Sequence, residues 1–238
     1  MRDKIIYIIP PAHPMFLLLL LLIVLFMPFI AIVFLGSITL AFTRLGISPE
    51  AAFSLVILSL IGSVVNIKVW EFRSYGPIIT QREVSFFGVR YIIPVMEFGE
   101  KKTILAVNLG GCIVPVAVSI YLIIRLISLG EYMVIYKALV SVAIATLIFK
   151  LVARPIQGVG IAMPFFVPPL TAALLGLIIA PENPVPVAFL SGTLGVLIGA
   201  DLLNLDKIKD LGAPIASIGG AGTFDGIFLA GVISVLLV

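Results

Sequence analysis

Long apolar stretches, separated by short polar segments, run the length of the chain. Seven of them approach the roughly 20 apolar residues that a helix needs to cross the hydrocarbon core of a bilayer. They are Met15–Thr43, Ala51–Trp70, Thr103–Ile127, Val134–Ala153, Pro164–Ala180, Val185–Leu203 and Pro214–Val238. The pattern predicts an all-α polytopic membrane protein with about seven transmembrane helices, forming a single membrane domain over residues 1–238. The fifth stretch is short and bounded by prolines, which favours a broken or re-entrant element there.

The longest polar segment, residues 71–102, predicts a small β-rich insertion outside the membrane. Its middle, Val84–Ile93, is rich in β-branched and aromatic residues around a Phe-Gly turn signal, which is typical of a hairpin. The N-terminal run Ile5–Ile9 has the same character and is expected to add a third strand, because three strands are more stable than two. Such a sheet suits a brace on the membrane face or an edge that binds a substrate by strand addition.

Composition agrees with a membrane protein, since 61% of the 238 residues are hydrophobic and the mean hydropathy is +1.28. Basic residues divide unevenly between the two predicted sides, twelve against three. By the positive-inside rule this predicts a multi-pass protein of the cell (plasma) membrane with a cytoplasmic N-terminus and an outer C-terminus. The twelve are Arg2, Lys4, Lys68, Arg73, Arg82, Arg90, Lys101, Lys102, Lys150, Arg154, Lys207 and Lys209, and the three are Arg44, Arg125 and Lys137.

The rare residue types limit the chemistry that the chain can perform. One histidine, His13, excludes a His-based catalytic triad and a histidine-rich metal site, and one cysteine, Cys112, excludes an internal disulfide. No metal site and no cofactor are expected. The positive charge is attributed to topology, so nucleic acid is not expected as a partner; membrane lipids and transmembrane helical substrates are.

Residues 154–238 differ in composition from the rest of the chain, because they contain more proline and glycine. Both residue types interrupt helices, and an interrupted helix at membrane depth needs surrounding protein or a water-filled cavity to satisfy its backbone groups. We therefore expect this half to form a polar, irregular centre and to carry the function.

Two carboxylates in this half, Asp201 and Asp225, are the strongest candidates for chemistry. An acidic side chain in a membrane segment costs several kcal/mol and usually has a role or a partner. Two adjacent carboxylates do not both ionise, so one acts as an acid while the other acts as a base toward water. Structural alternatives are that Asp201 reaches the cytoplasmic interface and that Asp225 is a packing carboxylate paired to Arg154 or to a backbone amide.

Helix geometry gives mixed support for a pair. Gly222 with Gly226, and Gly195 with Gly199, form small-residue steps that permit close helix approach. At 100° per residue, however, Asp201 points away from the Gly195/Gly199 stripe. A meeting of the two carboxylates is therefore expected to require that Ile218–Gly222 is not helical.

Other residues are expected to support this site. Arg154 and Gln157 begin the irregular half on the same predicted side, where Arg154 serves either as an interfacial anchor or as a partner that sets the carboxylate pKa values. Glycines at the start of the last helix present backbone amides. The supporting set is Arg154, Gln157, Pro168, Pro169, Asn204, Gly220, Gly222 and Gly226.

Three strings in this half, beginning at Arg154, Gly199 and Gly219, carry a family resemblance: Arg-Pro-Ile-Gln-Gly-Val-Gly, Gly-Ala-Asp-Leu-Leu-Asn-Leu and Gly-Gly-Ala-Gly-Thr-Phe-Asp-Gly. Over Arg154–Gly231 the chain resembles an archaeal and bacterial family of polytopic membrane proteins of unknown function, of the DUF sixteen-fourteen type. That resemblance implies membership and no particular activity.

The chain also shows a looser similarity to intramembrane aspartyl proteases, namely presenilin, signal peptide peptidase and the prepilin peptidases. Those proteins place one aspartate on an inward-running span and a second, in a Gly-x-Gly-Asp motif, on a following outward-running span. Asp201 and Asp225 have the corresponding predicted directions, with two more residues between Gly222 and the aspartate than in the motif. Pro168-Pro-Leu170 is similar to the presenilin-type Pro-Ala-Leu signature.

We therefore expect an intramembrane peptidase that uses Asp201 and Asp225 as acid and base. A proton- or cation-coupled transporter that uses the same carboxylates is the first alternative. A non-catalytic membrane scaffold, in which the aspartates only pack, is the second.

Overall fold

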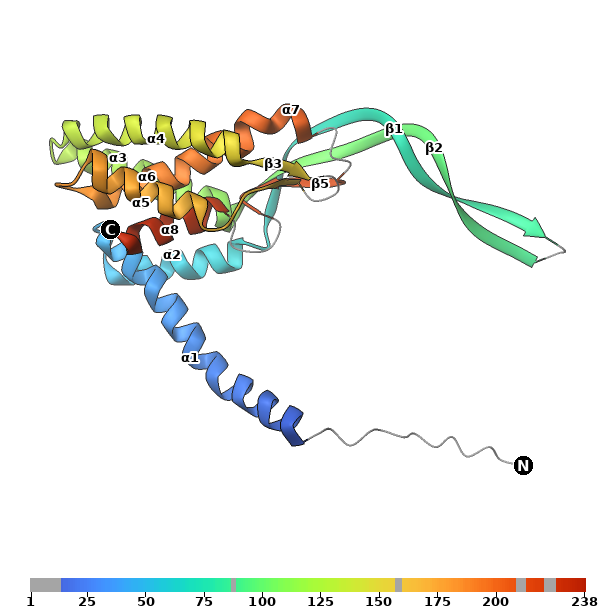
Figure 1. Cartoon of the computed structure of the whole chain (residues 1–238), viewed down its shortest axis with the longest axis horizontal. Helices are drawn as coiled ribbons and strands as arrows, with labels where there is room; N and C mark the ends of the chain where they lie inside the picture. The colour runs from blue at the N-terminus through green and yellow to red at the C-terminus, as the bar shows by residue number, and fades with distance from the viewer. Residues whose placement is uncertain (1–13, 87–88, 157–159, 209–212, 221–225) are drawn as a thin grey trace.

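The structure is a computed structural model of the chain, and it describes residues 14–86, 89–156, 160–208, 213–220 and 226–238 (Figure 1). Most of the described residues are helical. The helices are α1 (Pro14–Arg44), α2 (Pro49–Gly62), α3 (Val114–Ser128), α4 (Tyr132–Val152), α5 (Val167–Ile179), α6 (Pro184–Val196), α7 (Leu205–Ile208) and α8 (Gly226–Leu237). The strands are β1 (Asn66–Phe86), β2 (Val89–Asn108), β3 (Arg154–Ile156), β4 (Gly160–Ala162) and β5 (Ile215–Ile218).

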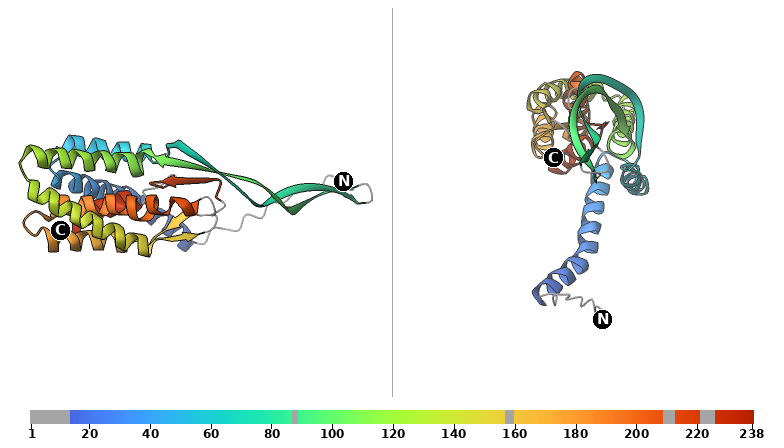
Figure 2. Two further views of the ribbon diagram at one scale, coloured as in Figure 1. Left: turned by 90° about the horizontal axis from the view of Figure 1, so that it is seen from above. Right: turned by 90° about the vertical axis from the view of Figure 1, so that its right-hand side faces the viewer.

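The helices α2–α6 and α8 lie side by side as a bundle, and the hairpin of β1 and β2 extends from one end of it (Figures 1 and 2). The helix α1 joins the bundle at its C-terminal end and diverges along its first half, where its apolar side chains are exposed. A helix that is apolar on all sides and not covered by protein suits a lipid environment.

The predicted class, a mostly helical polytopic membrane protein with a small sheet, is confirmed. Within the described residues four helical segments are long and apolar enough to cross a membrane: Leu17–Arg44, Leu109–Ser128, Tyr132–Val152 and Pro184–Ile208. Three shorter apolar helices, Pro49–Gly62, Val167–Ile179 and Gly226–Leu237, accompany them. The described helices therefore fall into a long and a short class.

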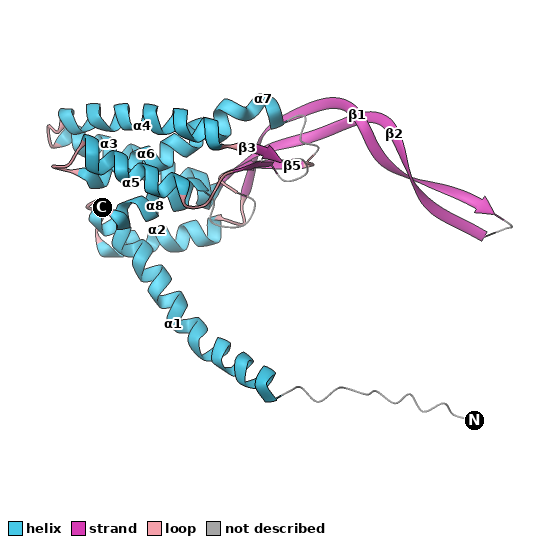
Figure 3. Ribbon diagram, viewed as in Figure 1, coloured by secondary structure: helices cyan, strands magenta, loops and turns pink. Residues whose placement is uncertain are grey.

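Three of the predicted spans contain β-structure at one end. The second stops being helical at Gly62, the third begins with the last residues of β2, and the seventh begins with β5 (Figure 3). In the second span the alternation of apolar and charged residues over Ile67–Arg73 has the period of a strand. A bulge between Lys68 and Trp70 accommodates the two consecutive apolar residues that interrupt this alternation.

The predicted hairpin is confirmed and is much longer than Val84–Ile93. The strands β1 and β2 are antiparallel, with a register that runs from Asn66 opposite Asn108 to Phe86 opposite Val89. The insertion therefore extends beyond residues 71–102 at both ends. The predicted turn lies outside the described residues, as does Ile5–Ile9. A third strand is present from another part of the chain, because β5 pairs with β2 in parallel along Ile104–Val107.

The helix α6 occupies the centre of the bundle, packed against α4, α5 and α8. Every residue from Pro186 to Thr193 is buried, so no face of this stretch is left for lipid or water. Phe42 of α1 makes edge-to-face ring contacts with Phe189 of α6 and Phe228 of α8. The hydrophobic core thus joins the first, the central and the last helix.

Glycines on α6 allow α4 to approach closely. A Cβ atom at Gly199 would lie 2.4 Å from the carbonyl oxygen of Thr146, and one at Gly195 would lie 2.7 Å from Cβ of Ala145. The predicted Gly195/Gly199 step is therefore a contact with α4 and does not face the last helix. Gly192 has the corresponding role toward α8, where a Cβ atom would lie 2.8 Å from the carbonyl oxygen of Ala230.

Polar side chains at the far end of the bundle satisfy the carbonyl groups that helix ends leave without partners. Arg44 donates to the carbonyl of Val235 near the end of α8 at 2.6 Å, and Arg125 donates to the carbonyl of Leu45 just after α1. Lys137 of α4 forms an ion pair with Glu182 in the loop before α6, and this hydrogen bond holds the pKa of Glu182 below its usual value.

We predict that Gly199→Ala lowers the free energy of unfolding by about 1–3 kcal/mol, because the added methyl group overpacks the contact with Thr146. Gly36→Ala is the matched control, since a Cβ atom at Gly36 in α1 meets no atom within 4 Å. That control should be neutral or slightly stabilising, as alanine favours helix. Thermal unfolding in detergent micelles measures both changes. Equal unfolding temperatures for the two variants would contradict the close α4–α6 contact.

Candidate functional site

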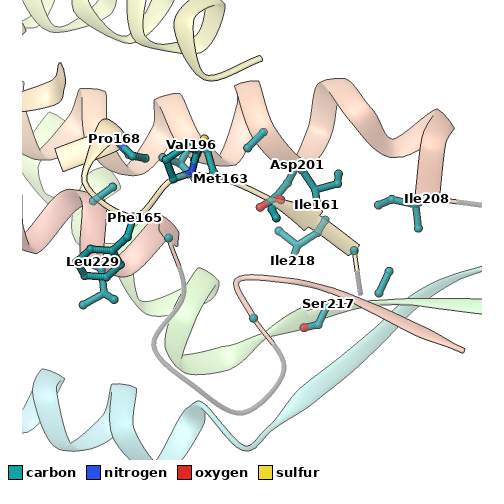
Figure 4. Close-up of a pocket in the computed structure, with 18 of the residues that line it drawn as sticks. Ile161, Met163, Phe165, Pro168, Val196, Asp201, Ile208, Ser217, Ile218 and Leu229 are labelled. Carbon is teal, nitrogen blue, oxygen red and sulfur yellow. The ribbon is translucent and has the colours of Figure 1, made fainter. Parts of the chain in front are cut away.

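A cavity of about 440 Å³ lies at the hairpin end of the bundle, where α6 ends and α8 begins (Figure 4). Its walls come from five places in the chain: the segment around β4, the first turn of α5, the C-terminal part of α6 with the turns that follow it, β5, and the start of α8. Most of the lining is apolar, and it includes Ile161, Met163, Phe165, Pro168, Val196, Ile208, Ile218 and Leu229. Among the described lining residues, Asp201 is the one with an acidic side chain.

Asp201 lies where the central helix loses its regular geometry. The helix α6 passes into a π-helical turn, Leu197–Asp201, and then into a 3₁₀ turn, Leu202–Asn204. Single π-helical turns inside α-helices change the direction of the side chains that follow and are frequent at functional sites. Figure 4 shows the Asp201 carboxylate directed into the cavity toward Ile218, and its Oδ2 atom is inaccessible to solvent.

This geometry resolves the difficulty that helix periodicity raised for Asp201. The predicted direction, away from the Gly195/Gly199 stripe, is what the structure shows, but that stripe faces α4. Pointing away from it turns Asp201 toward β5 and the start of α8, the part of the chain next to Asp225.

Asn204 holds the irregular turn in place. It is 1% exposed, and its amide nitrogen donates to the carbonyls of Gly199 at 3.2 Å and Ala200 at 2.9 Å. These are carbonyl groups that a change from α-helical to π-helical and 3₁₀ geometry leaves poorly paired. Lys207 donates in turn to the Asn204 Oδ1 atom at 2.7 Å. Asn204 therefore supports Asp201 through the backbone.

Asp225 lies outside the described residues, together with Gly222 and Gln157, so its separation from Asp201 is not described. The residues that flank this segment nevertheless show which part of the structure Asp225 is attached to. Gly220 and Gly226, the described residues on either side of residues 221–225, both line the cavity that contains Asp201. Asp225 is peptide-bonded to Gly226. Two of the predicted supporting glycines are therefore at the cavity, and both flank the segment that carries the second aspartate.

The described chain ahead of Asp225, which ends at Gly220, is not helical, as the pairing of the two aspartates was expected to require. Ile215–Ile218 is the strand β5, and Gly219 and Gly220 both have positive φ angles, 84° and 89°. Glycine adopts this conformation without the strain that a Cβ atom causes. Gly219 also packs directly on the turn before α3, because a Cβ atom there would lie 2.5 Å from Cβ of Cys112. The expectation for Ile218–Gly222 is confirmed over its described part, Ile218–Gly220.

A polar network anchors the sheet beside the cavity. Asn108, at the end of β2, is fully buried. Its side-chain amide donates to the carbonyl of Ser63 at 2.7 Å and to Oδ1 of Asn66 at 3.1 Å. Its Oδ1 atom accepts from the backbone amide of Gly111 at 2.8 Å. Ser217 of β5 donates to the same Asn66 oxygen at 2.6 Å. The strand that leads to Asp225 is thus fixed to the base of the hairpin.

The remaining predicted residues have different positions. Pro168 and Pro169 lie in the first turn of α5 and are buried, and Pro168 lines the cavity. Arg154 is exposed on β3, opposite Ala162 of β4, and is not among the cavity residues. This exposure favours the prediction that Arg154 is an interfacial anchor over the alternative that it pairs with a carboxylate.

Sequence reasoning missed the contribution of two short strands to the cavity. β4 supplies Gly160, Ile161 and Ala162, and all four residues of β5 line the wall. The sequence does contain a signal for β5. A short apolar run bounded by Pro214 and Gly219 is typical of a strand and not of a helix end. Among the described residues no three His, Cys, Asp or Glu side chains come together as metal ligands would.

We predict that Asn204→Ala lowers the free energy of unfolding by about 1–3 kcal/mol, because the carbonyls of Gly199 and Ala200 lose a buried donor. The control is Leu203→Ala, whose side chain is 42% exposed on the same turn. Hydrogen–deuterium exchange over residues 197–204 should increase in the first variant and not in the second. Unchanged exchange in Asn204→Ala would show that the turn does not depend on this side chain.

No curated protein and no solved structure matches the chain. One family model does match, over residues 60–237, and its description is protein of unknown function (DUF1614). The match includes the hairpin and all of the cavity, and it extends well beyond the Arg154–Gly231 stretch on which the sequence resemblance depends. The chain belongs to this family of proteins of unknown function.

Proposed function

We propose that the protein is an intramembrane aspartyl peptidase in which Asp201 and Asp225 act as acid and base. The observation that carries this proposal is the cavity, because it contains Asp201 and is bounded by Gly220 and Gly226, the two ends of the segment with Asp225. The irregular turn after α6 and the strand β5 ahead of α8 are two of the places where this end of the bundle departs from regular helix.

The chemistry needs no metal, serine or histidine. One carboxylate is ionised and removes a proton from water, which adds to the carbonyl carbon of the substrate. The other is protonated and gives its proton to the carbonyl oxygen. The tetrahedral intermediate then collapses: the carboxyl group that took the water proton gives it to the amide nitrogen, the other carboxylate takes the proton of one hydroxyl group, and the C–N bond breaks to release an amine and a carboxylic acid. Proximity is what keeps one of the two groups protonated at neutral pH.

The shape and lining of the cavity favour a peptide over a bare ion. A volume of about 440 Å³ with mostly apolar walls falls in the range of sites for organic ligands. A cation site would instead surround the ion closely with oxygen atoms. The strands β4 and β5 in the wall also place backbone groups beside Asp201, where an extended polypeptide forms hydrogen bonds most readily.

The supporting residues take roles that follow from their positions. Asn204 fixes the turn that directs Asp201, and Gly220 and Gly226 let the backbone come close to the substrate. Pro168 and Pro169 begin α5 at the cavity wall. Arg154 anchors β3 at the membrane surface, and Gln157 and Gly222 stay in the proposed supporting set although they lie outside the described residues.

We assign the cavity to the cytoplasmic side of the plasma membrane. All seven apolar segments enter the membrane, with the N-terminus inside and the C-terminus outside, and substrates are transmembrane helices that reach the site through the lipid. The hairpin, β3 and α7 lie at one end of the bundle (Figure 1), and their basic residues include Lys68, Arg154 and Lys207. That distribution supports the assignment by the positive-inside rule.

Labelling of single cysteines in intact cells tests the orientation. The starting point is Cys112→Ser, which removes the one native cysteine. We expect a membrane-impermeant maleimide to label Glu131→Cys, in the α3–α4 loop, and to leave Glu83→Cys, in the hairpin, unlabelled until the membrane is opened. The reverse pattern would place the hairpin and the cavity outside the cell.

Substitution of the carboxylates tests the activity. The purified protein in lipid should cleave a helical transmembrane substrate. Asp201→Asn and Asp225→Asn should each reduce turnover by a factor of about 10²–10⁴, the usual contribution of a general acid or base. Asp206→Asn is the control, because Asp206 is exposed on α7 and lies outside the cavity.

Full turnover by Asp225→Asn would disprove the paired mechanism. Ion flux into vesicles that depends on both aspartates, without any cleavage, would instead establish the transporter.

A further inference from the structure

The hairpin is far longer than the cavity needs as support. β1 has 21 residues and β2 has 20, which at roughly 3.3 Å per residue gives an arm of about 65 Å. It extends beyond the ends of the helices in both views, so most of it lies outside the membrane (Figures 1 and 2). A two-stranded ribbon of this length has two long edges that invite a further strand.

The edge of β2 is continuous with the wall of the cavity. Among the described strands β5 alone pairs with this edge, and it does so only along Ile104–Val107. Every residue of β5 lines the cavity. A segment that paired with β2 farther out, in line with β5, would therefore lead along the same sheet to Asp201.

The register shows which backbone groups this edge presents. The amide of Ile104 donates to the carbonyl of Pro214, just before β5, at 3.0 Å, so the amide of Ile104 faces outward from the ribbon. Because these directions alternate along a strand, the amides of Lys102, Glu100, Phe98 and Met96 face outward too. Pro94 occupies the next such position, and proline has no amide hydrogen to donate. The edge that the described residues leave open is Val95–Lys102, eight residues that begin after Pro94 and end before Thr103, whose buried hydroxyl donates to the carbonyl of Ala213 at 3.0 Å.

We propose that the Val95–Lys102 edge of β2 is a docking site for the extended, extramembrane tail of a membrane polypeptide. The inference builds on the proposed peptidase and names its substrate class: transmembrane segments that continue into an unstructured tail on the hairpin side. The tail pairs with β2 as an added strand, and its membrane segment then lies at the cavity. Backbone hydrogen bonds supply the affinity, so the tail needs no specific sequence.

The test measures binding to the full-length Asp201→Asn protein in lipid nanodiscs, so it does not depend on cleavage. The probe is a synthetic Leu/Ala transmembrane peptide, with or without a twelve-residue Ser/Thr/Val tail. We expect the tail to increase affinity about tenfold or more, as a few added hydrogen bonds would. N-methylation of alternate tail amides, which removes donors without changing the protein, should abolish that increase.

Two proline variants locate the edge. Met96 on β2 and Ile79 on β1 are opposite each other, and both amides face outward, so proline removes one outward donor on either side of the same ribbon. Met96→Pro should abolish the gain from the tail, whereas Ile79→Pro should keep it. Thermal unfolding of both variants checks that the ribbon itself survives.

Three results would overturn the proposal. They are a tail that adds no affinity, an N-methylated tail that binds as well as the unmodified one, and equal effects of the two prolines. A fourth is a decrease in the oligomeric mass of Met96→Pro without peptide, which would assign this edge to a second copy of the chain. Because binding is measured on a variant with one carboxylate removed, failure of the peptidase proposal leaves this result intact, and cleavage without tail dependence overturns only the docking site.

Discussion

Buried backbone amides and carbonyls need hydrogen-bond partners within the protein, and this requirement shapes the end of the bundle where the cavity lies. Helices meet it internally, but three helical segments stop or change geometry here. The Asn204 side chain donates to the carbonyl of Ala200 after α6. The Asn108 side chain donates to the carbonyl of Ser63 after α2 and accepts from the amide of Gly111 before α3. The backbone of β5 pairs with β2. The irregular backbone around Asp201 exists because each interruption has its own partner.

The central position of α6 explains why the irregularity falls where it does. A helix buried on all sides has its direction fixed by three neighbours, and glycines bring α4 and α8 within backbone contact. Its continuation past Val196 therefore cannot shift to relieve strain. The π-helical turn changes the side-chain direction locally instead, so a carboxylate enters the cavity while the packing against α4 is kept.

Hydropathy was sufficient to predict the helical membrane class, because long apolar runs have few other outcomes. It failed at the ends of three predicted spans, since a continuous apolar run has no period that separates a buried strand from a helix. The hairpin was predicted at its tip, where β-branched residues surround a turn signal, but not at its base. The direction of Asp201 was derived for a regular helix, and its meaning changed once Gly195 and Gly199 were found against α4. No sequence pattern announced the contact between Gly219 and the turn at Cys112, because close backbone approach depends on the tertiary fold.

The strand β2 runs continuously from Val89 near the tip of the hairpin to Asn108 at its base, and the one bulge lies in its partner strand between Lys68 and Trp70. The base of β2 is fixed by hydrogen bonds and its outer end is long, so a small rotation at the base produces a larger displacement at the tip. At roughly 3.3 Å per residue, a rotation of about 5° at the base moves the tip by about 6 Å. Rearrangements around Asp201 that are small on the scale of a side chain are thus magnified at the far end of the molecule, where a single spectroscopic label registers them.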